Sequence, residues 1–160
     1  MIFRLQQYIL DIDVEQTAAF YRTLPPISEG CHCDNCRNYQ YAVKHLHENT
    51  LAFFSALGID IAKPTEVYVN YATAEGILHY GGFYHLCGSI LQGSSAWVAS
   101  SETKNSKSFV WNDENTVSLD DEFRVSFQRQ CDLIEDTLPF PAIQLDFTAM
   151  IPWVLDAEMP

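Results

Sequence analysis

The sequence is poor in positive charge. Its 160 residues contain nine Lys and Arg against 21 Asp and Glu, which gives a formal net charge of −12. The acidic residues are spread along the chain and do not form a block. Proteins that bind nucleic acid or anionic membrane surfaces use Lys and Arg to neutralise phosphate groups. The composition therefore argues against both partners, and any partner that charge attracts is expected to be a basic protein.

A long, uniformly apolar run is also missing. The first seven residues include Arg4 and two Gln, where a secretion signal has about 7–15 apolar residues. The stretch 76–101 has no charged side chain, but it contains five of the seven glycines and is more typical of sheet core than of a spanning helix. Five cysteines, an odd number, do not suit a secreted disulfide framework. We therefore expect a cytoplasmic protein without a membrane span.

The familiar catalytic motifs are absent as well. The pair Gly81-Gly82 lacks the Lys-Ser/Thr of a phosphate-binding loop and the spacing of a dinucleotide-binding turn. His47-Glu48 begins a zinc-protease motif, but Leu51 stands where its second histidine would be. No serine has the flanking glycines of a nucleophile elbow. The sequence assigns no catalytic residue, and an enzyme is not the favoured interpretation.

One segment has a clear helical period. Apolar and small residues recur at spacings of four and three, which places them on one face of an α-helix, at Tyr39, Val43, Leu46, Thr50, Phe53 and Leu57. Asp34 or Asn35 can cap the start, and Gly58 can adopt the left-handed conformation after the end. The pattern predicts one helix from about residue 35 to residue 57, with Lys44, His45 and Glu48 facing water.

Alternating residues predict strands over much of the remaining chain. They recur in 5–14, 67–71, 77 onward, 97–99, 109–111, 123–128 and 143–153. Gly81-Gly82 predicts a tight turn or a bulge, and the serine-rich segment 94–108 predicts a mobile loop that contains a short strand. The expected fold is a single α+β domain over 1–160, with one long helix (about 35–57) packed on a mainly antiparallel sheet of five to seven strands.

The strongest chemical signal is a cysteine cluster. Cys31, Cys33 and Cys36 form a C-x-C-x-x-C run on a loop that leads into the predicted helix. Cys36 would lie in the first helical turn, where free N–H groups and the helix dipole favour a thiolate. Thiolate-rich tetrahedral sites hold zinc with four ligands at about 2.0–2.3 Å. The cluster therefore predicts a structural metal site, with zinc as the expected ion.

The sequence does not identify the fourth zinc ligand. His45 and His47 lie nine and eleven residues after Cys36, about 13 and 16 Å along a continuous helix, and are too distant. His85 and Cys87 are two residues apart on a predicted strand, face the same side of the sheet, and are the favoured candidates. Cys131 continues the core-facing alternation of its strand, which is typical of a buried apolar cysteine, and His32 is expected to point away from the metal.

Three other interpretations stay open. The thiols could form a redox pair such as Cys33 and Cys36, or the cluster could be a cysteine-rich turn without chemistry of its own. The net charge of −12 also suits an acidic protein–protein interaction, for example an immunity-type inhibitor that masks a basic toxin or nuclease.

Several short motifs together resemble a known group of sequences. They are Cys31-x-Cys33-x-x-Cys36-Arg37-Asn38-Tyr39, Leu57-Gly58-Ile59-Asp60, Lys63-Pro64 and Tyr80-Gly81-Gly82-x-Tyr84. Over about residues 24–90 the chain resembles a group of small uncharacterised bacterial proteins. The resemblance implies a bacterial cytosolic protein. It carries no activity, and so no catalytic residue is transferred by it.

Overall fold

The computed structural model describes residues 1–102 and 105–160. In chain order the elements are β1 (Ile2–Leu5), β2 (Tyr8–Ile12), α1 (Val14–Thr23), α2 (Ile27–Gly30), α3 (Asp34–Ala42), the 3-10 turn η1 (Val43–His45), α4 (Glu48–Ala56), β3 (Glu66–Ala72), β4 (Ile77–Gln92), β5 (Trp97–Glu102), β6 (Lys107–Trp111), the 3-10 turn η2 (Asp113–Asn115), β7 (Val117–Asp120), β8 (Phe123–Gln128) and β9 (Ala142–Pro152). The α+β class predicted from the sequence is confirmed.

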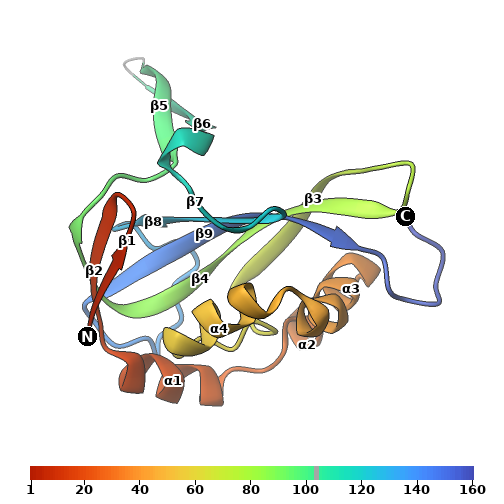
Figure 1. Cartoon of the computed structure of the whole chain (residues 1–160), viewed down its shortest axis with the longest axis horizontal. Coiled ribbons are helices and arrows are strands. Elements are labelled where there is room, and N and C mark those ends of the chain that lie inside the picture. The colour runs from red at the N-terminus through yellow and green to blue at the C-terminus, as the bar shows by residue number, and fades with distance from the viewer. Residues whose placement is uncertain (103–104) are drawn as a thin grey trace.

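Seven strands form one antiparallel sheet. Its order is β1-β2-β4-β9-β8-β7, and β3 also pairs with β4. This confirms the expected mainly antiparallel sheet of five to seven strands. The helices cover one face of the sheet, and β5 and β6 form a separate hairpin that projects from the other side (Figure 1). Residues 103 and 104, within the segment predicted as a mobile loop, lie outside the described residues.

The single helix predicted over 35–57 is wrong. The chain leaves α3 after Ala42, makes one 3-10 turn, and then extends at Leu46 and His47, whose ψ angles are 167° and 141°. His47 caps the new helix α4, because its Nδ1 accepts a hydrogen bond of 3.1 Å from the Asn49 N–H. A side chain that caps a helix offers the backbone an alternative to continuing the previous one.

The face predicted for that helix is nevertheless mostly buried. Four of its six periodic positions are fully buried, namely Tyr39, Val43, Thr50 and Leu57, while Lys44, His45 and Glu48 are exposed as expected. Gly58 has φ +80° after the end of α4, which confirms its predicted left-handed conformation. The helical period therefore identified the residues that α3 and α4 turn toward the sheet. It did not reveal the break between the two helices.

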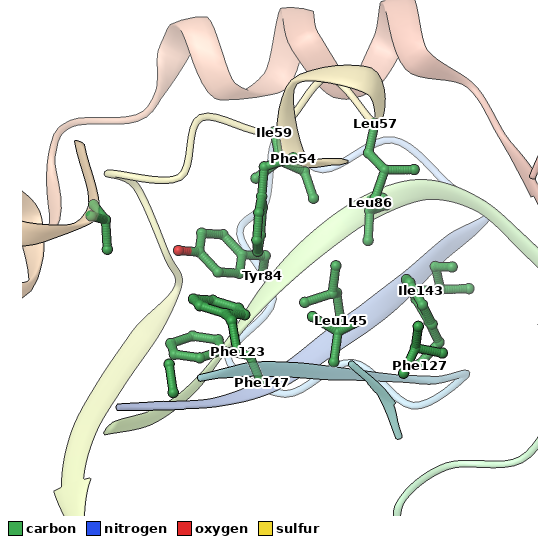
Figure 2. Packing of buried hydrophobic residues seen from close by; sticks show 14 of the residues in the cluster. Phe54, Leu57, Ile59, Tyr84, Leu86, Phe123, Phe127, Ile143, Leu145 and Phe147 are labelled. Atoms are coloured by element: carbon green, nitrogen blue, oxygen red, sulfur yellow. The ribbon is translucent and has the colours of Figure 1, made fainter. Parts of the chain in front are cut away.

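The core between helices and sheet is largely aromatic. Figure 2 shows Phe54 of α4 reaching toward Tyr84 of β4, with Phe123 and Phe147 on the neighbouring strands. The ring centroids of Phe54 and Tyr84 are 5.1 Å apart, and those of Phe123 and Phe147 are 5.2 Å apart. Aromatic pairs at such distances contribute beyond the area that they bury. This layer holds α4 against the middle of the sheet.

The long strand β4 has two different partners along one edge. Its first half pairs with β3 as far as Phe83, and its last part pairs with β2 from Gly88 onward. Helix α1 supplies hydrogen bonds to the segment between them. The Tyr21 hydroxyl accepts from the His85 N–H at 3.1 Å and donates to the His85 carbonyl at 2.8 Å, and Thr17 Oγ1 accepts from the Cys87 N–H at 3.1 Å. Buried backbone groups need such partners, so these contacts position α1.

The opposite face of the sheet is partly covered too. The alternation of β9 assigns Gln144, Asp146 and Thr148 to the side away from the helical core, and the first two are only 1% and 3% exposed. Gln144 Oε1 accepts a hydrogen bond of 2.8 Å from the Asp132 N–H, in the segment between β8 and β9. That segment and the hairpin therefore shield side chains that a one-sided sheet would leave in water.

Gly81 and Gly82 form neither the turn nor the bulge predicted for them. Both lie within β4, where they pair in register with β3 and β9. A Cβ on Gly82 would lie 2.3 Å from the Glu66 carbonyl oxygen and 2.9 Å from the Phe147 ring. The glycine is therefore required by the close approach of its neighbours.

We predict that Gly82→Ala lowers the free energy of unfolding by about 1–3 kcal/mol, because backbone and a buried ring must move to admit the methyl group. Urea denaturation measures the loss. Gly30→Ala is the matched control, since a Cβ there meets nothing within 4 Å. Equal stability of the two variants would contradict the packing argument.

Candidate metal centre

The three cysteines of the sequence motif come together in the structure. The Sγ atoms of Cys31, Cys33 and Cys36 all lie within 4.8 Å of one another, and those of Cys31 and Cys33 are 3.2 Å apart. The short helix α2 ends at Gly30, and the Cys31 N–H donates to the Ile27 carbonyl at 3.0 Å. The chain is then extended until α3 begins at Asp34. This local geometry turns all three sulfurs toward a common point, so the three could hold a metal ion.

Cys33 caps helix α3, in place of the predicted Asp34 or Asn35. Its backbone is extended, with φ −72° and ψ 154°, and its Sγ accepts a hydrogen bond of 3.5 Å from the Cys36 N–H. Asp34 is instead the first helical residue and forms an ion pair of 2.8 Å with Arg37. The Cys33 sulfur therefore lies at the N-terminus of α3, against the backbone N–H of Cys36.

The cluster is anchored to the sheet through two polar residues. Asn38 Nδ2 donates to the Pro152 carbonyl at 3.1 Å, and Asn38 Oδ1 accepts from the Val154 N–H at 2.7 Å. The Tyr80 hydroxyl donates to the Asn35 carbonyl at 2.6 Å. Cys36 is 5% exposed beneath this contact, whereas Cys33 is exposed. One side of the cluster is therefore held by the fold and the other is open to solvent.

The environment separates the thiol pKa values. Hydrogen bonds, first from the Cys33 N–H and then from the neighbouring thiols, lower the pKa of Cys31. Burial, followed by the proximity of the other two sulfurs, raises the pKa of Cys36 well above its ordinary range. Without a cation, Cys31 therefore ionises more readily than Cys36. A bound cation would oppose the cost of ionising Cys36.

The structure places neither His85 nor Cys87 at the cluster. Tyr80 of β4 contacts Asn35 in the first turn of α3, and the two candidates lie five and seven residues farther along β4, about 17 and 23 Å by strand geometry. The imidazole Nδ1 of His85 lies 3.4 Å from Thr65 Oγ1. Across residues 1–102 and 105–160, no further His, Cys or carboxylate joins the three sulfurs at ligand spacing.

The expectation that Cys131 is a buried apolar residue on the core face of its strand is also wrong. Cys131 lies half-buried in the segment after β8 and not on the core face of that strand.

Sequence reasoning did not assign a role to Asn38 or Tyr80, although both lie in the quoted motifs. Nothing in the helical period distinguishes Asn38 from a solvated residue. Asn38 is completely buried because it packs against the end of β9, where it bonds to Pro152, 114 residues later in the chain.

Comparisons with known proteins return no relative. No protein-family model, no curated protein and no solved structure matches the chain. The resemblance to small bacterial proteins therefore stays an expectation from the motifs. Among the described residues, no helix has the length and apolar composition needed to cross a bilayer.

We predict that metal-free protein near neutral pH is alkylated by iodoacetamide faster at Cys31 than at Cys36, because the pKa of Cys31 is lowered and Cys36 is buried. Peptide mass spectrometry over a time course measures the two rates. In guanidinium the difference should disappear, since it comes from the fold. Faster modification of Cys36 in the folded protein would contradict the geometry.

Proposed function

We propose that the chain is a zinc-binding protein whose metal is held by Cys31, Cys33 and Cys36, with a solvent molecule as the fourth ligand. The zinc has a structural role, because it joins the loop after α2 to the first turn of α3. The single observation that carries the proposal is the convergence of the three Sγ atoms within 4.8 Å.

The donor set suits zinc. Zn–S bonds of about 2.3 Å in a tetrahedron place neighbouring sulfurs about 3.8 Å apart. The spacing of the three sulfurs brackets that value, between the 3.2 Å of Cys31 and Cys33 and the upper limit of 4.8 Å. Thiolates are soft ligands, which favour zinc or Cu(I) over Mg²⁺ or Ca²⁺. The exposed side of the cluster, at Cys33, leaves room for a water molecule.

The surrounding contacts indicate what the metal would stabilise. Helix α2 is only four residues long, Ile27–Gly30, and none of its residues is buried. Short isolated helices are marginal in water. A metal bonded to Cys31 on one side and to the buried Cys36 on the other would tie this segment to α3, and through Asn38 and Tyr80 to the sheet.

We predict one zinc per chain in protein purified without added metal. Elemental analysis by mass spectrometry measures the ratio.

Cys31→Ser and Cys36→Ser each should weaken zinc binding more than tenfold in competition with a chromophoric chelator, because loss of even an indirect partner of a metal site lowers metal affinity 10–100-fold. Cys131→Ser is the matched control, a partly buried cysteine outside the cluster, and should bind as the unmodified chain does.

Cobalt substitution adds a spectroscopic readout. Cobalt(II) bound by three thiolates gives intense sulfur-to-metal charge-transfer absorption, which the Cys36→Ser variant should reduce. The proposal would be overturned if the purified protein contained no metal and bound none when titrated. The three cluster thiols would then be equally reactive with and without chelator.

We also predict that removing the metal destabilises the fold. A ligand held at one hundred times its Kd stabilises the native state by about 2.7 kcal/mol. EDTA should therefore lower the Tm of the unmodified chain and leave that of Cys36→Ser unchanged. Thermal melts by circular dichroism measure both. An equal effect of EDTA on the two proteins would point to metal bound elsewhere.

A thiol redox role is the second candidate, because Cys31 and Cys33 approach to 3.2 Å between their sulfurs. Oxidation would join these two sulfurs in a disulfide, and their two protons and two electrons would pass to a partner disulfide that is reduced to two thiols. A disulfide between Cys31 and Cys33 in aerobically purified, metal-free protein would favour this role over zinc.

A further inference from the structure

A second candidate site lies on the face of the sheet opposite the helices. A cavity of about 340 Å³ opens between that face and the β5–β6 hairpin. Its walls include the aromatic rings of Tyr68, Phe83, Trp97 and Phe109, and Asp146 and Gln144 of β9 also line it. Cavities of this size and composition are typical of small-molecule sites. It is separate from the cysteine cluster, which packs with α3 on the helical side.

The aromatic walls come from three separate parts of the fold. The Tyr68 ring lies over Gly81, where a Cβ would be 2.6 Å from it, so this glycine makes room for the wall. Phe83 is buried on β4, directly opposite Asp146 in the strand register. From the hairpin, Trp97 packs edge-on against Trp111 at 5.1 Å between centroids, and Phe109 is 55% exposed.

The polar end of the cavity is a buried carboxylate. Asp146 is 3% exposed, and its two oxygens accept hydrogen bonds of 2.8 Å from Gln144 Nε2 and Gln128 Nε2. Both of these hydrogen-bond donors are neutral amides. Asp132 also lines the cavity, and among residues 1–102 and 105–160 no Lys or Arg side chain belongs to the lining. Burying a carboxylate without a cationic partner costs free energy. A positively charged ligand in the cavity would offset this cost by pairing with Asp146.

We propose that this cavity binds a small organic cation, with a primary ammonium group against Asp146 and an apolar body between Tyr68, Trp97 and Phe109. The carboxylate supplies charge and hydrogen-bond acceptors for the ammonium group. The ring faces add cation–π attraction and bury the hydrocarbon part of the ligand. A neutral or anionic ligand of the same shape would leave the carboxylate unpaired, so the site selects by charge.

The ionisation of Asp146 adds a pH dependence. Burial raises the pKa of Asp146 to about 6. The titratable groups that interact with it are Asp132 and Cys131 before β9, Tyr8 on β2 and Tyr68 on β3. His85 on β4 interacts with the lining residues Gln144 and Asp132, and burial lowers its pKa. Of the cations nearby, Arg124 on β8 pairs with Thr148, two residues from Asp146, and Lys107 stands two residues before Phe109 on β6. Burial also raises the pKa of Cys131 to about 11 and raises the pKa of both tyrosines, so these three groups stay neutral near pH 6.

Three ligands of one shape test the proposal in the full chain. Phenethylamine carries the positive charge, 2-phenylethanol is neutral, and phenylacetate is negative. Isothermal titration calorimetry, with tryptophan fluorescence as a second readout at Trp97, should give phenethylamine an affinity at least tenfold above the alcohol and no binding of the acid. Phenethylamine binding should weaken progressively as the pH falls through about 6, because Asp146 becomes neutral.

Matched variants locate the site. Asp146→Asn keeps the shape and should abolish the preference for the amine over the alcohol. Asn Oδ1 can still accept from Gln144, and Gln128 can rotate its amide to accept from Asn Nδ2. Phe109→Ala removes an exposed wall at little cost to the fold and should weaken phenethylamine binding several-fold. Val110→Ala, on the same strand and 47% exposed but outside the lining, is the control and should bind normally.

Equal affinities for the three ligands, or amine binding that neither Asp146→Asn nor Phe109→Ala changes, would overturn the proposal. Binding of polylysine that falls with salt and ignores both substitutions would assign the attraction to the overall charge of −12, as expected for a basic protein partner. EDTA should leave phenethylamine binding unchanged, which keeps this test independent of the cysteine cluster.

Discussion

The arrangement of the molecule depends on two buried tyrosine hydroxyls of β4. Tyr80 donates to the Asn35 carbonyl, and Tyr84 donates to the Ile61 carbonyl at 2.6 Å while sharing a hydrogen bond of 2.5 Å with the Tyr39 hydroxyl. A buried hydroxyl without a partner costs free energy, so each of these groups must meet its partner. The two contacts hold the start and middle of α3 over the sheet. The position of the cysteine loop is then determined by α3, because the loop leads directly into the start of this helix.

The sheet was predictable because it follows from local patterns. The alternation from Ile143 to Trp153 marks β9, and the change of period after Lys63-Pro64 marks β3 and β4. The division of the predicted helix was not predictable from its period. Leu46 keeps the spacing of a helical face although its backbone is extended, and the cap that starts α4 depends on a histidine, an uncommon capping residue.

The candidate sites show the same division between local and long-range information. The spacing of Cys31, Cys33 and Cys36 predicts their convergence, because six residues at a helix start cannot separate three sulfurs far. The choice of His85 or Cys87 as a further ligand depended on where β4 runs relative to α3, and no short pattern contains that. The burial of Asp146 is likewise not contained in the pattern of its own strand, because the hairpin and the segment between β8 and β9 are what cover it.

In the part of the hairpin that the structure describes, no residue pairs with the seven-stranded sheet, and the base is closed by a hydrogen bond of 2.8 Å from the Asn112 N–H to the Ala96 carbonyl. The ladders and the aromatic core are therefore complete without it. Strand pairing in the sheet therefore does not constrain the length of the hairpin, whereas Trp97 and Phe109 are constrained because they cover Gln144 and Asp146. Substitutions on the cavity side of this hairpin would change the shape of the candidate site and leave the strand pairing of the sheet beneath it intact.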